Sequence, residues 1–241
     1  MRFDIMTLFP ELVDTVLGES IIGRARAAGV IDVRVHNIRD YTLDRHRRVD
    51  DTPYGGGRGM LMAAPPIYNC YASVLAGSDE ILTEAPPRPE GLHVIYMSPR
   101  GKTFTQKDAE RLASYDRLMI ICGHYEGVDE RLIEEIVDEE VSIGDFVLTG
   151  GEVPACIVTD AVARLVDGVL PVPECHENET FGGNLLEYPQ YTRPPVFRGR
   201  EVPEVLLSGH HENIDKWRLA ESERITEARR PDLYKRYLEE K

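Results

Sequence analysis

The chain has 241 residues, 42% of them hydrophobic and 29% charged, which is enough for one large domain, or for one domain with a small appendage. No apolar run approaches the roughly 20 residues that span a bilayer, and the short apolar start, which contains Asp4, is unlike a signal peptide. The net charge of −14 argues against indiscriminate nucleic-acid binding, and the 4 cysteines form no C-x-x-C pair that would bind zinc. We therefore expect a cytoplasmic protein with reduced cysteines and no membrane contact.

The charge is uneven along the chain. Residues 189–241 hold 11 Lys and Arg against 10 Asp and Glu, a net charge of +1, so the first 188 residues carry −15. A nearly neutral C-terminal part on an acidic body can bind RNA if its basic residues share one face.

The N-terminal part alternates strands with helices. The pattern predicts a strand over 2–8, a helix from Pro10 to about Leu17, a second helix capped by Ser20, and a strand over 33–36. Residues 39–60 then form a long polar loop with several arginines and glycines. Such a composition suits contact with a phosphodiester backbone, although a solvated surface loop has the same appearance. A nucleotide phosphate loop is the weaker alternative, because GGGRGM lacks the Lys-Ser/Thr pair.

The middle of the chain predicts parallel strands. A helix over 65–75 and an exposed connection over 78–90 precede a buried strand over 92–97, which should end in a turn at Ser98–Lys102. Thr105 and Asp108 resemble a capping box, and the next strand runs over 118–122. This rhythm indicates an α/β fold whose mainly parallel sheet has helices on both faces. The turns at Ser98, at Gly123 and over 142–151 should then lie at one edge, where α/β proteins bind ligands.

A nearly all-apolar helix follows, from Val153 to Leu165, with Pro154 in its first turn. Such a helix must be covered on every side, by its own chain or by a partner. Asp160 and Arg164 interrupt it four residues apart, so they can form a buried ion pair; alternatively, Arg164 points from the helix end into a site. Spacing alone slightly favours the ion pair.

The C-terminal part is predicted to be a linker followed by a small helical domain. Residues 166–187 show little apolar periodicity, and a helix should run from about Ser208 to Glu227, followed by a short last helix. Trp217 could stack on a base, but a lone tryptophan more often anchors a core, which is the interpretation we favour.

Long motifs in a fixed order give the chain a family resemblance over almost its whole length. They are TLFPE (7–11), DRHRRVDDTPYGGGRGMLM (44–62), YMSPRGK (96–102), CGHYEGVDER (122–131), SIGDFVLTGGEVPA (142–155), LLEYPQYTRP (185–194) and PEVLLSGHH (203–211). With these motifs the chain resembles the bacterial tRNA (guanine-N1)-methyltransferases, which belong to the SPOUT superfamily of knotted methyltransferases.

The resemblance implies a fold that periodicity does not reveal, since knots are rare in proteins. It implies a deep trefoil knot in an S-adenosylmethionine-binding domain over 1–165, a flexible linker over 166–188 and a small C-terminal helical tRNA-binding domain over 189–241. It also implies a homodimer with shared active sites. The implied cofactor-binding residues are Tyr96, Met97, Ser98, Pro99, Gly123, Tyr125, Glu126, Gly127, Ser142, Ile143, Gly144, Asp145, Phe146, Val147, Leu148, Gly150, Gly151 and Pro154.

The implied reaction is methyl transfer to N1 of guanosine 37 of tRNA, 3′ of the anticodon. The resemblance implies that Arg164 stabilises the negative charge that develops at O6 of the guanine. It therefore reverses the preference for an ion pair with Asp160. The family's general base is an aspartate, and the matching residue here is Glu179, with Glu177 as a substitute. The resemblance also implies a Mg²⁺ requirement, for which Glu126 is a candidate ligand; no metal site follows from the residues themselves.

Two alternatives share parts of this pattern. One is a SPOUT ribose 2′-O-methyltransferase, which the DRHRRVDD and YTRP segments disfavour. The other is a non-catalytic RNA-binding module, which the intact SIGDFVLTGGE segment and Arg164 disfavour.

Overall fold

The structure is a computed structural model that describes residues 1–171, 180–181 and 184–241. The chain divides into two compact units, Met1–Pro171 and Val172–Lys241, each of which is described by itself. Within the described ranges, no helix combines the length and apolarity needed to cross a membrane.

The first unit is built on a five-stranded sheet in which every pairing is parallel. This confirms the predicted α/β class with a mainly parallel sheet. In spatial order the strands are β2 (Asp32–Asn37), β1 (Arg2–Thr7), β6 (Arg117–Cys122), β5 (Leu92–Thr103) and β7 (Glu139–Ser142).

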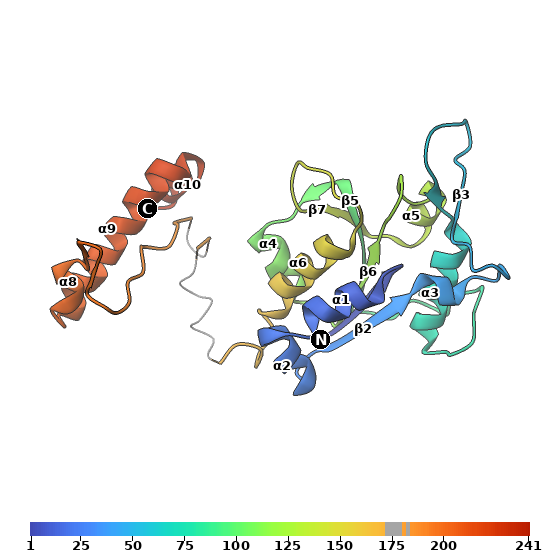
Figure 1. The fold of residues 1–241 in the computed structure, drawn as a ribbon, viewed down its shortest axis with the longest axis horizontal. Coiled ribbons are helices and arrows are strands. Elements are labelled where there is room, and N and C mark those ends of the chain that lie inside the picture. The colour runs from blue at the N-terminus through green and yellow to red at the C-terminus, as the bar shows by residue number, and fades with distance from the viewer. Residues whose placement is uncertain (172–179, 182–183) are drawn as a thin grey trace. The chain divides into compact units, whose positions relative to one another are not determined.

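Helices cover both faces of this sheet, as expected for parallel strands (Figure 1). Alternate side chains of β1 explain the two layers: Phe3 and Ile5 point into one core, and Met6 points into the other. On the first face lie α1 (Pro10–Leu17), α2 (Ser20–Ala27), α4 (Gln106–Leu112) and α6 (Glu152–Ala163). On the second face lie η1 (Ile38–Tyr41), α3 (Ala64–Ala76) and α5 (Glu130–Ile136).

The predicted turn at Ser98–Lys102 is wrong. β5 continues through it to Thr103 and pairs with β7 on both sides of a register shift between Met97 and Lys102. Gly101 makes this possible, because a Cβ there would overlap the backbone of Glu140. The sequence did not predict β7 either, since its residues EEVS lack the apolar run of a buried strand.

The polar segment after β2 is largely a loop, as predicted, but it holds two short strands, β3 (Asp50–Asp51) and β4 (Leu61–Met62). Between them the chain projects beside α5 (Figure 1). Val49 is fully buried and anchors the near end of this projection.

In the part of the second unit that the structure describes there are a hairpin and three helices: β8 (Val196–Phe197), β9 (Arg200–Glu201), α8 (Glu204–Leu207), α9 (His211–Arg229) and α10 (Pro231–Glu240). Among these described residues, the buried apolar side chains are Ile214 and Leu233. Trp217 is partly buried, and its ring centroid lies 6.3 Å from that of Tyr191, so it packs against a side chain of its own unit.

A buried carboxylate fixes the start of the sheet. Asp4 is fully buried in β1 and accepts hydrogen bonds from Arg2 at 2.7 Å and Arg117 at 2.7 Å, and it lies 2.8 Å from Nε2 of His36. Burial raises the pKa of Asp4, but the hydrogen bonds from His36 and Arg2 and the charges of Arg117 and Arg2 outweigh it, so the pKa is lowered.

We predict that Asp4→Asn lowers the free energy of unfolding at pH 7 by about 2 kcal/mol. This loss is smaller than that expected for a fully buried ion pair, because Arg2 and Arg117, which pair with Asp4, are partly exposed. The contribution of Asp4 is present above the unfolded pKa of about 3.9 and is lost as pH falls through the lowered folded pKa, so the difference should shrink toward pH 3. Urea unfolding followed by far-UV circular dichroism measures both values.

The matched control is Asp32→Asn, since Asp32 pairs with Arg34 at the surface of the neighbouring strand. It should cost under about 0.5 kcal/mol. An Asp4→Asn difference that stays constant between pH 7 and pH 3 would contradict the assignment.

Candidate active site

The middle of β5, the segment that follows β6, and the end of β7 with the loop after it form a cavity of about 510 Å³. Its walls come from three segments, over 96–100, 123–130 and 141–154, and from Leu61. Its volume lies within the ~300–1,000 Å³ range of small-molecule sites.

This cavity brings together nearly all the residues that the sequence proposed for cofactor binding. Those that line it are Tyr96, Met97, Ser98, Pro99, Gly123, Tyr125, Glu126, Gly127, Ser142, Ile143, Phe146, Val147, Leu148, Gly150, Gly151 and Pro154. Gly144 and Asp145 lie in the same loop but not in the lining. The lining also includes residues that the sequence did not select, namely Leu61, Arg100, His124, Val128, Glu130, Val141 and Thr149.

Backbone runs directly against backbone at the floor of this cavity. The N–H of Gly151 donates to the carbonyl oxygen of Gly123 at 2.8 Å, and His124 forms an isolated antiparallel bridge with Gly150. A Cβ on Gly151 would lie 2.8 Å from Cα of Cys122, closer than real side chains approach. Glycine is therefore required here for close approach rather than for an unusual backbone angle.

Tyr96 forms a buried side wall. A Cβ on Gly123 would lie 2.7 Å from its hydroxyl oxygen, so Gly123 leaves the space that the phenol fills. Burial, and then the nearby charge of Glu140, raise the pKa of Tyr96, which keeps the hydroxyl protonated.

A buried carboxylate lies beneath the cavity. Glu152 begins α6, where the helix dipole favours an acid, and Thr7 donates a hydrogen bond to it at 2.7 Å. Its other oxygen is 3.9 Å from Nδ1 of His124. This cluster joins β1, the cavity wall and the start of α6.

The rim of the cavity is acidic. Arg100 lies 3.0 Å from Glu130 and 3.4 Å from Glu140, and Glu126 adds a further carboxylate to the lining. The hydrogen bond that Arg100 donates to Glu130, followed by the charge of Glu140, raises the pKa of Arg100. Because the lining holds one arginine and two glutamates, its carboxylates outnumber its permanent cations, which favours a ligand with positive charge.

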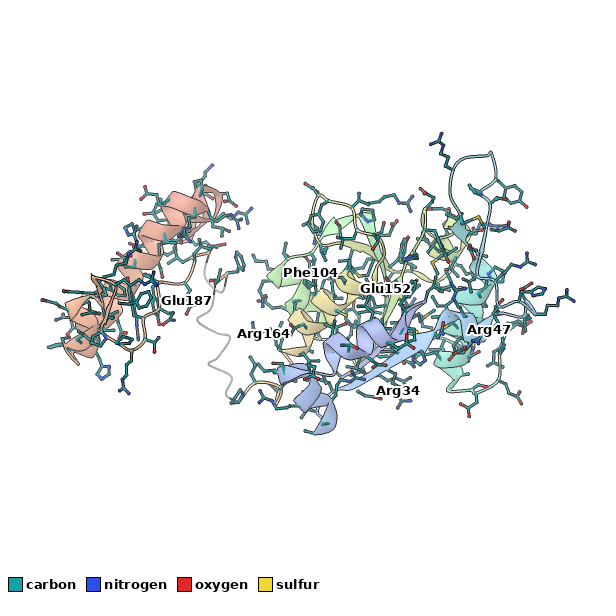
Figure 2. All side chains as sticks on the ribbon, viewed as in Figure 1. Arg34, Arg47, Phe104, Glu152, Arg164 and Glu187 are labelled. Carbon is teal, nitrogen blue, oxygen red and sulfur yellow. The ribbon has the colours of Figure 1, made fainter. Side chains whose placement is uncertain are left out.

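Arg164 is not in this cavity. It follows the 12-residue helix α6, whose ends are roughly 18 Å apart at about 1.5 Å per residue, and Figure 2 labels Glu152 and Arg164 at its two ends. The prediction of a buried ion pair with Asp160 is wrong, since Asp160 is exposed. The described hydrogen bond between them runs from the backbone N–H of Arg164 to the carbonyl oxygen of Asp160.

Two predicted residues cannot be placed. Glu177 and Glu179, the two candidates for the general base, lie outside the described residues. Among the residues that the structure does describe, no group of three or more His, Cys, Asp or Glu side chains is arranged to hold a metal ion.

Comparison with known proteins identifies the family of the chain. A family model described as tRNA (Guanine-1)-methyltransferase TrmD matches residues 1–236. The chain belongs to this family. It is 54% identical to the tRNA (guanine-N(1)-)-methyltransferase of Lachnospira eligens over 99% of this chain and 97% of that protein. It is 52% identical to that of Ruminiclostridium cellulolyticum, over 97% and 96% of the two chains, and 51% identical to that of Clostridioides difficile, over 98% of each.

Membership in the tRNA (guanine-N1)-methyltransferase family makes the chain a methyltransferase enzyme, and it confirms the resemblance read from the motifs. The match spans both compact units. The names of these relatives agree with neither alternative, the ribose methyltransferase nor the non-catalytic RNA-binding module.

Proposed function

We propose that the enzyme transfers a methyl group from S-adenosylmethionine to N1 of guanosine 37 of tRNA. The observation that carries the proposal is the cavity, in which one continuous wall is made from the ends of three parallel strands in a chain of this family. The donor carries a sulfonium and an ammonium against one carboxylate, so its net charge suits the acidic rim.

We propose that the donor is held mainly by the loop that follows β7. The loop offers backbone groups along with the exposed apolar side chains of Phe146, Val147 and Leu148, which would cover an adenine ring. The buried walls at Tyr96 and Met97 would exclude water from the other side.

The same loop supports the proposal of a trefoil knot. β7 lies at the edge of the sheet beside β5, yet the segment after it returns past the end of β5 and reaches β6 at Gly150 and Gly151. From there α6 continues against α1, α4 and β6. A chain that forms a trefoil knot must return across its own strands in this way.

We propose that the active site is shared between two copies of the chain. Arg164 lies about a helix length from the cavity of its own chain, so a role at the reacting base requires Arg164 of the partner subunit. An apolar groove between α1, α2 and α6 offers the interface. The apolar side chains exposed there are Leu12 (46%), Val16 (50%), Val153 (49%) and Ile157 (45%). Exposed apolar patches of this kind mark interaction surfaces.

The chemistry then needs two protein groups. The donor supplies an electrophilic methyl carbon, whose bond to sulfur breaks as its bond to N1 forms, and the electron pair stays on sulfur. Glu179 takes the proton from N1, and Arg164 donates hydrogen bonds to O6, where negative charge develops. Among the described residues, the carboxylates of the lining, Glu126 and Glu130, belong to no group of three or more side chains that could hold a Mg²⁺ ion.

We propose that tRNA meets the loop over 44–59. Arg45, Arg47 and Arg48 are exposed, and Tyr54 is 100% exposed and free to stack on a base. Asp44 orders the loop by accepting from the backbone N–H of His46 at 2.8 Å. Residues 1–165, 166–188 and 189–241 would act as the catalytic domain, a linker and a tRNA-binding domain of a cytoplasmic enzyme.

The proposal is tested by incubating the protein with labelled S-adenosylmethionine and tRNA transcripts that carry guanosine or adenosine at position 37. We predict 1-methylguanosine in the nucleoside digest of the first transcript and no label in the second. A ribose-methylated product, or transfer to a different guanosine, would contradict the proposed function.

We predict that Glu179→Gln lowers the rate of methyl transfer by roughly 100-fold or more while the Kd of the donor analogue sinefungin is unchanged, because the amide cannot accept the N1 proton. Single-turnover kinetics and calorimetry measure the two effects. Glu177→Gln is the matched control and should retain near wild-type transfer. If the two variants exchange phenotypes, the base is Glu177.

We predict that Ile157→Lys converts a homodimer into a monomer that binds sinefungin but does not transfer methyl, because Arg164 can no longer reach the partner's cavity. Sedimentation velocity measures the oligomeric state. Leu238→Lys, at an apolar residue of α10 that is 55% exposed, should leave the dimer intact. A wild-type enzyme that is monomeric and fully active would contradict the proposal of a shared active site.

A further inference from the structure

Gly59 lies in the loop between β3 and β4, outside the cavity, yet it directly faces a residue that lines the cavity. A Cβ on Gly59 would lie 2.5 Å from both Cγ and Oε1 of Glu126. The loop therefore leaves a space of the size of a methyl group, and the side chain of Glu126 occupies it.

Backbone hydrogen bonds hold the loop and the cavity turn in this register. The N–H of Glu126 donates to the carbonyl oxygen of Met60 at 3.0 Å, and the N–H of Met62 donates to that of Gly127 at 2.9 Å. A third bond, from the N–H of Asp129 to the carbonyl oxygen of Met62, is 3.0 Å long. These bonds pair Met60 and Met62 with the turn, and Gly59 directly precedes the first of these paired residues.

Glu126 itself is exposed and has no helix or strand to fix its side chain. A free glutamate side chain samples several rotamers, and ordering it costs conformational entropy. The backbone of Gly59 restricts it from one side, which favours rotamers that keep the carboxylate at the mouth of the cavity.

From these contacts we infer that Gly59 is a positioning residue: it orients the Glu126 carboxylate toward the cationic end of the methyl donor and so links the arginine-bearing loop over 44–59 to the donor cavity. This inference rests on the proposed function, because it takes the cavity to be the donor site. A ligand that moves the loop would shift the carboxylate, and the linkage would be reciprocal.

The chain offers a matched pair of glycines for the test. Gly59 and Gly56 both adopt left-handed backbone angles, with φ of +86° and +78°, but a Cβ on Gly56 would meet nothing within 4 Å. Alanine at either position imposes similar backbone strain, and only Gly59→Ala displaces Glu126. The two variants should therefore have equal midpoints of urea unfolding, which separates positioning from folding.

We predict that Gly59→Ala raises the Kd for sinefungin roughly tenfold, because the displaced Glu126 carboxylate no longer faces the cationic end of the ligand, while Gly56→Ala stays within about twofold of wild type. Calorimetry measures each Kd. In steady-state methylation, the donor KM should rise and kcat at saturation should change little, since the contact aids donor binding.

A double-mutant cycle shows whether the effect acts through Glu126. In a Glu126→Ala background, adding Gly59→Ala should not weaken sinefungin binding further. Equal Kd values for Gly59→Ala and Gly56→Ala, or a full Gly59→Ala effect in the Glu126→Ala background, would overturn the inference. Failure of the wild-type enzyme to bind sinefungin would instead overturn the proposed donor site.

Discussion

The cavity depends on one close crossing of two stretches of backbone. After β7 the chain returns to β6, and Gly151 lies against Cys122 and Gly123 with no room for a Cβ. A second crossing, of Gly101 against Glu140, ties β5 to β7. Protein interiors are packed so densely that even one added methyl group would push these segments apart. The cavity is therefore a consequence of how tightly these backbone segments can be brought together.

Charged side chains lie beneath the cavity and around its rim. The buried carboxylate of Glu152 lies under the floor, where Thr7 donates to it and the start of α6 favours it. The glutamates of the rim are exposed, so they remain available to a ligand. Arg164, by contrast, is separated from its own cavity by the length of α6. One chain thus holds the proposed donor cavity and, about a helix length away, the guanidinium proposed to contact the base, which is why we propose a site shared between two copies.

The sequence predicted the sheet well where side chains alternate between two buried layers, as in β1 and β6, because that pattern is set by local periodicity. It missed β7, whose charged residues satisfy partners across the edge of the sheet, such as the pairing of Glu139 with Arg111 at 2.9 Å. It also ended β5 at Ser98, because the pairing that extends the strand is made by the distant residues Val141 and Ser142.

Prediction of the site depended on the same distinction. The glycine turns indicated a binding edge, and nearly all of the residues that the family motifs proposed lie in the lining. Arg100 and Glu130 were missed because a rim is defined by the meeting of β5, β7 and α5 in space, which neither periodicity nor spacing encodes. The ion pair of Asp160 with Arg164 was suggested by spacing on a helix, but Asp160 faces outward at the apolar groove.

We propose that the cavity of one subunit and Arg164 of another form a single active site. The most direct measurement is a crystal structure of the enzyme with sinefungin and a tRNA anticodon stem-loop. We predict that sinefungin lies in the cavity beside β5, β6 and β7, with the guanidinium of the partner's Arg164 about 3 Å from O6 of guanosine 37. Sinefungin bound elsewhere, or a guanine contacted by Arg164 of the same subunit, would contradict it.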